Sequence, residues 1–349
     1  MQQYGVLVVD DSSFMRRCIS MIIEKNPQFF IIGIARNGQE AVEKVQRLKP
    51  DIVTMDVEMP EMDGIAALKV IMSTCPVPVV MLSNHTEEGA KTTIKALQLG
   101  AVEFFLKSAL VGEDVSQQVH QNFLDNLQTI VEGAKIPVHN VTEEAPKAVQ
   151  RNIKSSIECK SDLLIIGCST GGPSALQSLL PRFPQDFCVP IIVIQHMPPG
   201  FTGPLAERFD TICNLHVKEG EDEDILEAGT IYIAPAGFQT YLRRKGDGKI
   251  ALKIEDSAPI QTVYKPSVNV TLLSAAPIFK DRLLTVVMTG MGNDGLVGCG
   301  EVKRQKGRVI VEAEETCIVY GMPKVVFDAG LADVQVPLPQ IFQYVMQSL

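Results

Sequence analysis

Short apolar runs alternate with amphipathic stretches along the first third of the chain. The apolar runs are typical of buried parallel strands, and the stretches between them carry apolar residues at helical spacing. Strands are expected at residues 6–9, 29–34, 52–55, 77–82 and 104–106, and helices at 13–25, 38–49, 64–73, 86–99 and 115–130. This alternation predicts an α/β fold with a (βα)5 doubly wound domain over residues 1–133.

The alternation stops over residues 134–160, where proline, asparagine and serine residues interrupt it, so this segment is expected to be a linker. Apolar runs return at 163–167, 189–195, 230–234, 283–289 and 308–311, with a helical stretch at 174–180 and a C-terminal helix from Pro339. We therefore expect a second α/β domain, built on a parallel sheet, over residues 161–349.

The amino-acid composition and the net charge indicate which classes of protein the chain can belong to. With 46% hydrophobic and 21% charged residues, the chain is expected to be globular. Its net charge of −9 disfavours binding to nucleic acid or anionic lipid. No apolar run reaches the roughly 20 residues of a membrane helix, and the N-terminus lacks the pattern of a signal peptide. Eight scattered cysteines without a C-x-x-C pair favour a reducing compartment. These features predict a cytoplasmic protein with neither a nucleic-acid partner nor membrane insertion.

Five polar residues stand where predicted strands of the first domain end: Asp10, Asp11, Asp56, Ser83 and Lys107. The carboxyl ends of parallel strands meet at one sheet edge, so these side chains are expected to converge. Three carboxylates there repel one another unless a hard cation such as Mg2+ neutralises them. Asp56 is placed to attack a phosphoryl donor, with Lys107 and Ser83 binding the new oxygens. The alternative is that the aspartates only cap helices and turns.

The segments VVDDSSFMRR at 8–17, MDVEMPEMDG at 55–64 and LSNHTEEGA at 82–90 resemble response-regulator receiver domains. The resemblance implies phosphorylation of one aspartate by a histidine kinase. It assigns the roles as follows: Asp56 as phosphoacceptor, Asp10 and Asp11 with Asp56 as Mg2+ ligands, and Ser83, Phe104 and Lys107 as switch residues. Receivers usually carry proline after the lysine, whereas Ser108 stands here and removes the basis for the cis peptide that orients that lysine.

A glycine-rich turn follows the first strand of the second domain. The spacing Gly167-x-Ser169-x-Gly171 matches a nucleophile elbow, in which small neighbours present a serine hydroxyl near a helix N-terminus. The alternative is a phosphate-binding or merely tight turn, although neither G-x-G-x-x-G nor G-K-[ST] is present.

Two further strand ends supply partners for that serine. The run 189–195 ends in His196, and the run 283–289 leads into GMGNDG at 290–295, which contains Asp294. A lone histidine is usually structural, but these strand ends bring it toward Ser169. Histidine removes the serine proton, aspartate orients the histidine, and backbone amides around Met291 are placed to stabilise an oxyanion. The order Ser, His, Asp differs from that of α/β-hydrolases.

The segments IGCSTGGP at 166–173, IQHMPPGFT at 194–202 and TGMGNDG at 289–295 resemble the catalytic domain of chemotaxis protein-glutamate methylesterases. The resemblance implies the following roles: Ser169 as nucleophile, His196 as general base, Asp294 as its orienting partner, Met291 near the oxyanion and Thr170 in support. Two residues depart from the family pattern, because Gln239 stands where histidine is common and Asn269 where aspartate is usual.

Together the two resemblances imply a phosphorylation-activated serine esterase without a cofactor of its own. It is expected to demethylate glutamyl esters, and to deamidate glutamines, on the cytoplasmic helices of methyl-accepting chemoreceptors. The receiver is expected to cover the active-site cleft until Asp56 is phosphorylated. The alternatives are a nonenzymatic phosphate sink or scaffold, a DNA-binding response regulator and a dinucleotide-binding output domain.

Overall fold

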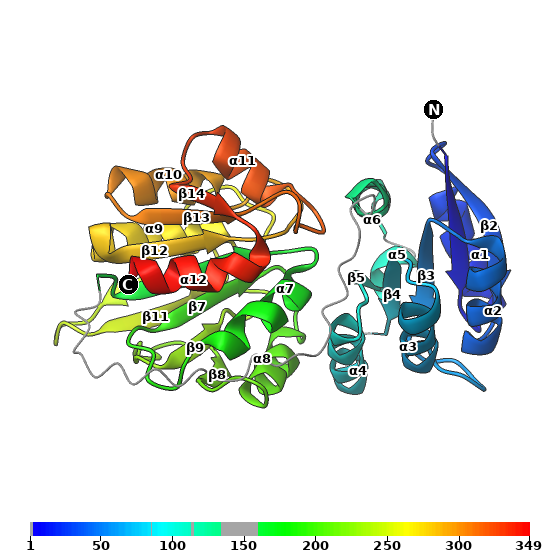
Figure 1. Cartoon of the computed structure of the whole chain (residues 1–349), viewed down its shortest axis with the longest axis horizontal. Coiled ribbons are helices and arrows are strands. Elements are labelled where there is room, and N and C mark those ends of the chain that lie inside the picture. Colours follow the sequence, from blue (N-terminus) through cyan, green and yellow to red (C-terminus); the bar gives the residue numbers. More distant parts are fainter. Residues whose placement is uncertain (1–2, 85, 113–114, 134–159) are drawn as a thin grey trace.

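The computed structural model describes residues 3–84, 86–112, 115–133 and 160–349, which form two α/β units (Figure 1). The first unit is a five-stranded parallel sheet in the order β2-β1-β3-β4-β5. Its strands are β1 (Tyr4–Val9), β2 (Phe29–Ala35), β3 (Ile52–Asp56), β4 (Val79–Ser83) and β5 (Glu103–Leu106). Its helices are α1 (Ser13–Ile23), α2 (Gly38–Leu48), α3 (Gly64–Thr74), α4 (Glu87–Gln98), α5 (Lys107–Leu110) and α6 (Gln117–Gly133).

Helices on both faces bury the central strands of this sheet, which is why β1, β3 and β4 are apolar almost throughout. The helices begin at capping side chains. Asn37, Asp63 and Thr86 each accept a hydrogen bond from a backbone N–H in the first turn of α2, α3 and α4. The doubly wound fold expected from the sequence is confirmed.

The second unit is a seven-stranded parallel sheet in the order β14-β13-β12-β6-β7-β9-β8. Its strands are β6 (Leu163–Cys168), β7 (Ile191–Gln195), β8 (His216–Glu219), β9 (Thr230–Ile233), β12 (Leu283–Val287), β13 (Arg308–Glu312) and β14 (Val334–Val336). A separate antiparallel hairpin consists of β10 (Gln239–Arg244) and β11 (Ile250–Glu255). The parallel α/β class predicted for this unit is confirmed.

Two helical layers cover the second sheet. One layer contains α7 (Gly172–Leu179), η1 (Leu180–Arg182), α8 (Thr202–Asp210) and α12 (Leu338–Ser348). The other contains α9 (Val268–Phe279), η2 (Lys280–Arg282), α10 (Leu296–Arg304) and α11 (Met322–Asp328). The expected linker falls almost wholly outside the described residues, so its bounds stay a prediction.

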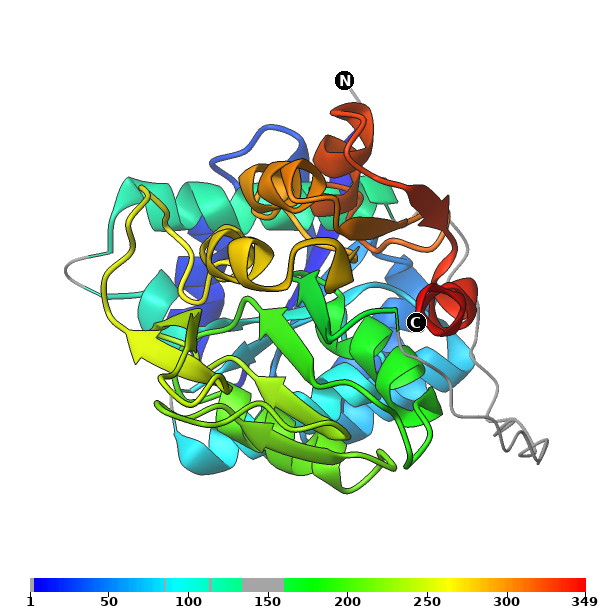
Figure 2. The same cartoon turned by 90° about the vertical axis from the view of Figure 1, so that its left-hand side faces the viewer.

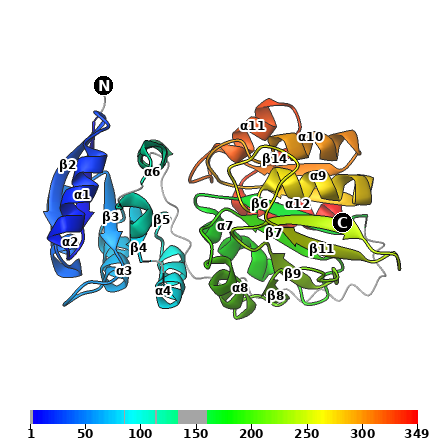
Figure 3. The same cartoon turned by 180° about the vertical axis from the view of Figure 1, so that it is seen from behind.

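The two units meet through α4, β5 and α6 of the first, a surface that we call the closure face. It lies against α7 and α8 of the second unit (Figures 1 and 3), and in the perpendicular view the second unit stands in front of the first (Figure 2). The rings of Phe104 and Phe201 stack across the contact, with centroids 4.6 Å apart. Lys91 forms an ion pair with Glu207 at 3.5 Å.

Two findings bear on the expected compartment. None of the described helices is long and apolar enough to cross a membrane. Six described cysteines are free thiols, whereas Cys188 is disulfide-bonded. The free thiols agree with the reduced cysteines that the sequence favours, and Cys188 departs from them.

Candidate functional site

His196 and Asp294 lie in contact at the carboxyl edge of the second sheet. His196 directly follows β7, and Asp294 lies in the loop between β12 and α10. The His196 Nε2 and Asp294 Oδ2 atoms are 2.8 Å apart, and the two side chains are only 10% and 1% exposed. The structure thus brings together two of the three residues predicted to form a triad.

The N-terminus of α9 holds the Asp294 carboxylate. Asp294 accepts hydrogen bonds from the Ser267 hydroxyl at 2.8 Å and from the N–H groups of Val268 at 2.7 Å and Asn269 at 3.0 Å. Burial pushes the pKa of Asp294 upward, but His196 and these donors outweigh it and lower the pKa below its usual value. Asp294 is therefore ionised and fixed in orientation.

The pairing of strands β6 and β7 places the Ser169 backbone beside this pair. Cys168 at the end of β6 pairs with Gln195 at the end of β7, so the next residues of the two strands are neighbours. The Gln195 side chain donates to the Ser169 carbonyl at 3.0 Å. Among the described residues, Ser169 Oγ has no hydrogen-bond partner, and neither has the buried Nδ1 atom of His196. The structure does not bring the hydroxyl and the imidazole into a hydrogen bond.

Of the two supporting residues, Thr170 directly follows Ser169, and Met291 lies in the loop whose Gly290 packs against Ser169. Within the described part of the chain, the Met291 N–H has no hydrogen-bond partner, and the preceding Gly290 is held through its own N–H to the Val319 carbonyl at 3.0 Å. Thr170 is buried, and its hydroxyl donates to Asn126 of α6 at 3.3 Å. Met291 is thus placed with an unused amide, and Thr170 is placed under the closure face.

The acidic residues of the first unit also converge. Carboxylate oxygens of Asp10, Asp11 and Asp56 all lie within 4.8 Å of one another. Lys107 Nζ lies 2.8 Å from Asp10 Oδ2 and 2.6 Å from Asp56 Oδ2. Burial raises the pKa of Asp56 to about 6, against the opposing effect of Lys107. The Lys107–Ser108 peptide is trans, yet the lysine still reaches both carboxylates.

The other two switch residues lie on β4 and β5. The buried Ser83 hydroxyl accepts a hydrogen bond from Thr93 of α4 at 2.8 Å and donates to the Asn84 carbonyl at 3.2 Å. Phe104 points into the contact with the second unit. The predicted switch aromatic therefore belongs to the closure face.

Comparison with known proteins identifies the family. A family model for CheB methylesterases matches residues 164–345, and a model for response-regulator receiver domains matches residues 6–115. The chain belongs to the CheB methylesterase family. This membership confirms the two resemblances drawn from the sequence, whereas the roles of single residues stay predictions.

Relatives match along almost the whole chain. A protein-glutamate methylesterase/protein-glutamine glutaminase of Thermotoga maritima is 41% identical over 344 residues, covering 96% of each chain. A protein of the same name, numbered 1, from Oleidesulfovibrio alaskensis is 40% identical over 367 residues and covers 99% of each chain. The crystal structure of the Thermotoga maritima CheB methylesterase catalytic domain is 42% identical, with a TM-score of 0.52, and covers 54% of this chain and 99% of that one.

The two departures from the methylesterase pattern have structural roles here. Gln239 is fully buried; it donates to the Tyr264 carbonyl at 2.7 Å and accepts from the Ser267 N–H at 3.0 Å. Asn269 Oδ1 accepts from the N–H groups of Gly295 and Gly298, at 3.1 and 2.8 Å. Asn269 therefore supports the segment that follows Asp294, and Gln239 supports Ser267, whose hydroxyl donates to Asp294.

Two further residues of the site are not among those predicted from the sequence. The Tyr264 ring stacks on the His196 imidazole with centroids 4.3 Å apart and planes 10° from parallel. The Gln195 amide donates to the carbonyls of both Ser169 and His196 at 3.0 Å. The adjacency of Gln195 to His196 was a usable signal, but Tyr264 lies in a loop without periodicity.

The acidic cluster of this methylesterase-family chain fits Mg2+. Hard oxygen donors from Asp10, Asp11 and Asp56 lie close enough to share one small cation, and Mg2+ prefers such carboxylates together with water. A cavity of about 520 Å³ opens beside Asp11 and Arg36. Asp11 is thus exposed to solvent while the two units are in contact, whereas Asp10 and Asp56 are buried.

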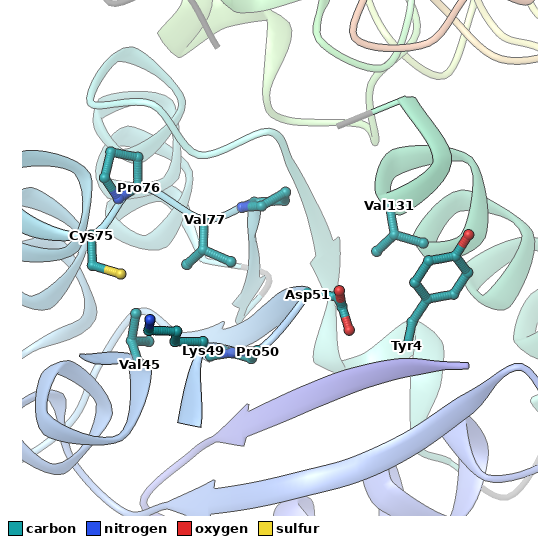
Figure 4. Close-up of a pocket in the computed structure, with 10 residues that line it drawn as sticks. Tyr4, Val45, Lys49, Pro50, Asp51, Cys75, Pro76, Val77 and Val131 are labelled. Carbon is teal, nitrogen blue, oxygen red and sulfur yellow. The ribbon is translucent and has the colours of Figure 1, made fainter. Parts of the chain in front are cut away.

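A second cavity, of about 370 Å³, lies at the opposite end of the same sheet. Tyr4, Asp51, Cys75 and Val131 are among its lining residues (Figure 4). None of the predicted site residues lines it, so it takes no part in the candidate site.

Proposed function

We propose that the chain is a phosphorylation-regulated protein-glutamate methylesterase and protein-glutamine glutaminase. Its substrates are glutamyl methyl esters and glutamines on the cytoplasmic helices of methyl-accepting chemoreceptors. The observation that carries the proposal is the 2.8 Å contact between His196 and a buried, ionised Asp294 beside the Ser169 turn. The names of relatives that match nearly the whole chain support the substrate class.

In the proposed reaction, Ser169 Oγ attacks the ester carbonyl while His196 takes the hydroxyl proton. Because Nε2 faces Asp294, Nδ1 is the nitrogen left to receive this proton. The Met291 N–H donates to the carbonyl oxygen as it gains charge. His196 then returns the proton to the departing methoxide, and methanol leaves. Water then attacks the acyl-enzyme while His196 takes the water proton, and His196 returns this proton to Ser169 Oγ. An amide substrate releases ammonia in place of methanol.

The contact between the units supports control by the receiver. Thr170, next to the nucleophile, is buried against Asn126 of α6, and Ser169 has no hydrogen bond to His196 in this arrangement. A histidine kinase phosphorylates Asp56, with Lys107 and Ser83 binding the phosphoryl oxygens. Asp10, Asp11 and Asp56 would hold Mg2+, which when bound would neutralise charge on the phosphoryl group. Phosphorylation then shifts the population of molecules toward an arrangement with an open active site. The enzyme acts in the cytoplasm, where the receptor helices lie.

The test is methanol release from methylated receptor membranes by the full chain, with and without a small-molecule phosphodonor. Ser169→Ala is expected to lower kcat about a thousandfold or more, as loss of a triad nucleophile does. Ser348→Ala, the same change on α12, is the matched control and is expected to retain activity. Asp56→Asn is expected to abolish stimulation by the phosphodonor. Wild-type turnover by Ser169→Ala contradicts the esterase; stable phosphorylation of Asp56 without any methanol release favours the phosphate sink.

A further inference from the structure

We propose that Tyr264 is a positioning residue for the general base, its ring fixing the plane of the His196 imidazole during proton transfer. The inference rests on the proposed function in treating His196 as the base. The ring centroids lie 4.3 Å apart and the planes are 10° from parallel, so the two rings are stacked face to face. Asp294 holds the imidazole of His196 at one edge only. This single hydrogen bond does not fix the tilt of the imidazole plane.

Backbone contacts hold the tyrosine itself in place. Its carbonyl accepts from the fully buried Gln239 side chain at 2.7 Å, and its N–H donates to Thr262 Oγ1 at 3.1 Å. The hydroxyl end reaches the loop that carries Met291, because a Cβ atom added at Gly292 would lie 2.4 Å from it. Gly292 also has a φ of 89°, which favours glycine. This position therefore requires glycine both for its backbone conformation and for the space beside Tyr264. The ring therefore spans from the base to the loop of the predicted oxyanion donor.

This placement has two chemical consequences. With one face covered by Tyr264 and one edge held by Asp294, the imidazole is held in one plane, and Nδ1 is the nitrogen that Asp294 leaves free. The histidine becomes a cation in that step, and an aromatic face attracts a cation. Burial and the nearby Asp294 charge raise the pKa of the Tyr264 phenol, so the ring is neutral at working pH.

The test compares Tyr264→Phe, which keeps the ring, with Tyr264→Leu, which removes it. Both are measured in the full chain with receptor membranes and a small phosphodonor. Tyr264→Leu is expected to lower kcat about tenfold or more with KM changed less than about twofold, because a tilted base misplaces the proton transfer. Tyr264→Phe is expected to retain at least about half of kcat, since the stacking face is unchanged. Tyr241→Leu on β10 controls for loss of a tyrosine elsewhere in the unit.

A second measurement needs no esterase activity, and its first reading is made on the wild-type protein. In wild-type protein with labelled histidine, the His196 ring protons, assigned by comparison with His196→Gln, are expected to lie upfield of those of the other histidines, because a stacked ring shields them. Tyr264→Leu should remove this shift and Tyr264→Phe should keep it. Wild-type kcat in Tyr264→Leu, equal losses in both variants, or an unshifted His196 resonance would each overturn the inference. Absence of methanol release from wild type overturns the proposed function instead, while the resonance still tests the stack.

Discussion

Asp294 gives the sharpest prediction at the scale of single residues. Replacing it by asparagine turns one acceptor oxygen into a donor, which faces the donors of His196 and Val268 if it stands at the Oδ2 position. His196 then loses the partner that fixes its tautomer, and kcat for methanol release is expected to fall about a thousandfold to ten-thousandfold, as in other triads. Steady-state methanol assays of the full chain measure this loss.

The control for this change is Asp281→Asn, which removes an exposed carboxylate from η2 in the same unit. It is expected to leave kcat unchanged. If Asp294→Asn retained more than about a tenth of wild-type kcat while folded, Asp294 would be a structural cap of α9 rather than the partner of a base.

Glu312 makes the stability of the second unit depend on pH. It is fully buried at the end of β13 and accepts a hydrogen bond from the Thr289 N–H at 2.8 Å. Burial raises its pKa from 4.5 to about 7. The folded state therefore binds more protons than the unfolded state between these values, so this residue makes the free energy of unfolding fall as pH rises from about 4.5 to 7.

Glu312→Gln removes the buried charge and keeps an acceptor for Thr289. At 1.36 kcal/mol per pKa unit, the variant is expected to gain up to about 3 kcal/mol over wild type above pH 7, and little near pH 4.5. Denaturant unfolding of the second unit at several pH values measures the difference. A stability gap that does not grow between pH 5 and 8 would show that Glu312 is already ionised at low pH.

At the scale of elements, Asn269 links two helices. It lies in the first turn of α9 and accepts hydrogen bonds from the Gly295 and Gly298 N–H groups at the start of α10, which has no side-chain cap of its own. Asn269→Ala leaves these donors without a partner and is expected to destabilise the second unit by about 1–2 kcal/mol. Asn269→Asp keeps the acceptor and is expected to cost less. Thermal unfolding of both variants against wild type tests this order.

Elements with strong periodicity could be predicted from the sequence, and so could the residues at their ends. The apolar runs before Ser169, His196 and Asp294 form adjacent strands β6, β7 and β12, and parallel strands bring their ends to one edge. Helix α9 is apolar on nearly all sides and gave no amphipathic pattern. Tyr264 lies in an irregular segment, so its stack on His196 depends on tertiary contacts that periodicity does not encode.

At the scale of the whole molecule, the contact between the units could not be predicted from the hydrophobic pattern of either unit alone. The sequence predicts Phe104 to be a switch aromatic, but nothing in the neighbouring residues indicates that Phe201, just after the His196 loop, is its partner. The stacked rings of Phe104 and Phe201 are the part of this contact that joins a predicted switch residue to the loop following the predicted base. This pair therefore couples the two functions if the receiver controls the esterase.

Phe104→Leu is the test of that coupling. Leucine keeps an apolar side chain of similar volume but removes the ring that stacks on Phe201 at 4.6 Å. Aromatic pairs contribute about 0.5–1.5 kcal/mol beyond their buried area, so the closed population is expected to fall and unphosphorylated methanol release to rise about threefold to tenfold. Phe105→Leu is the matched control, because Phe105 packs edge-on against Phe123 within the receiver at 4.9 Å. Basal rates that rise equally in both variants would point to a loosened receiver, and an unchanged rate in Phe104→Leu would mean that this stack does not hold the active site closed.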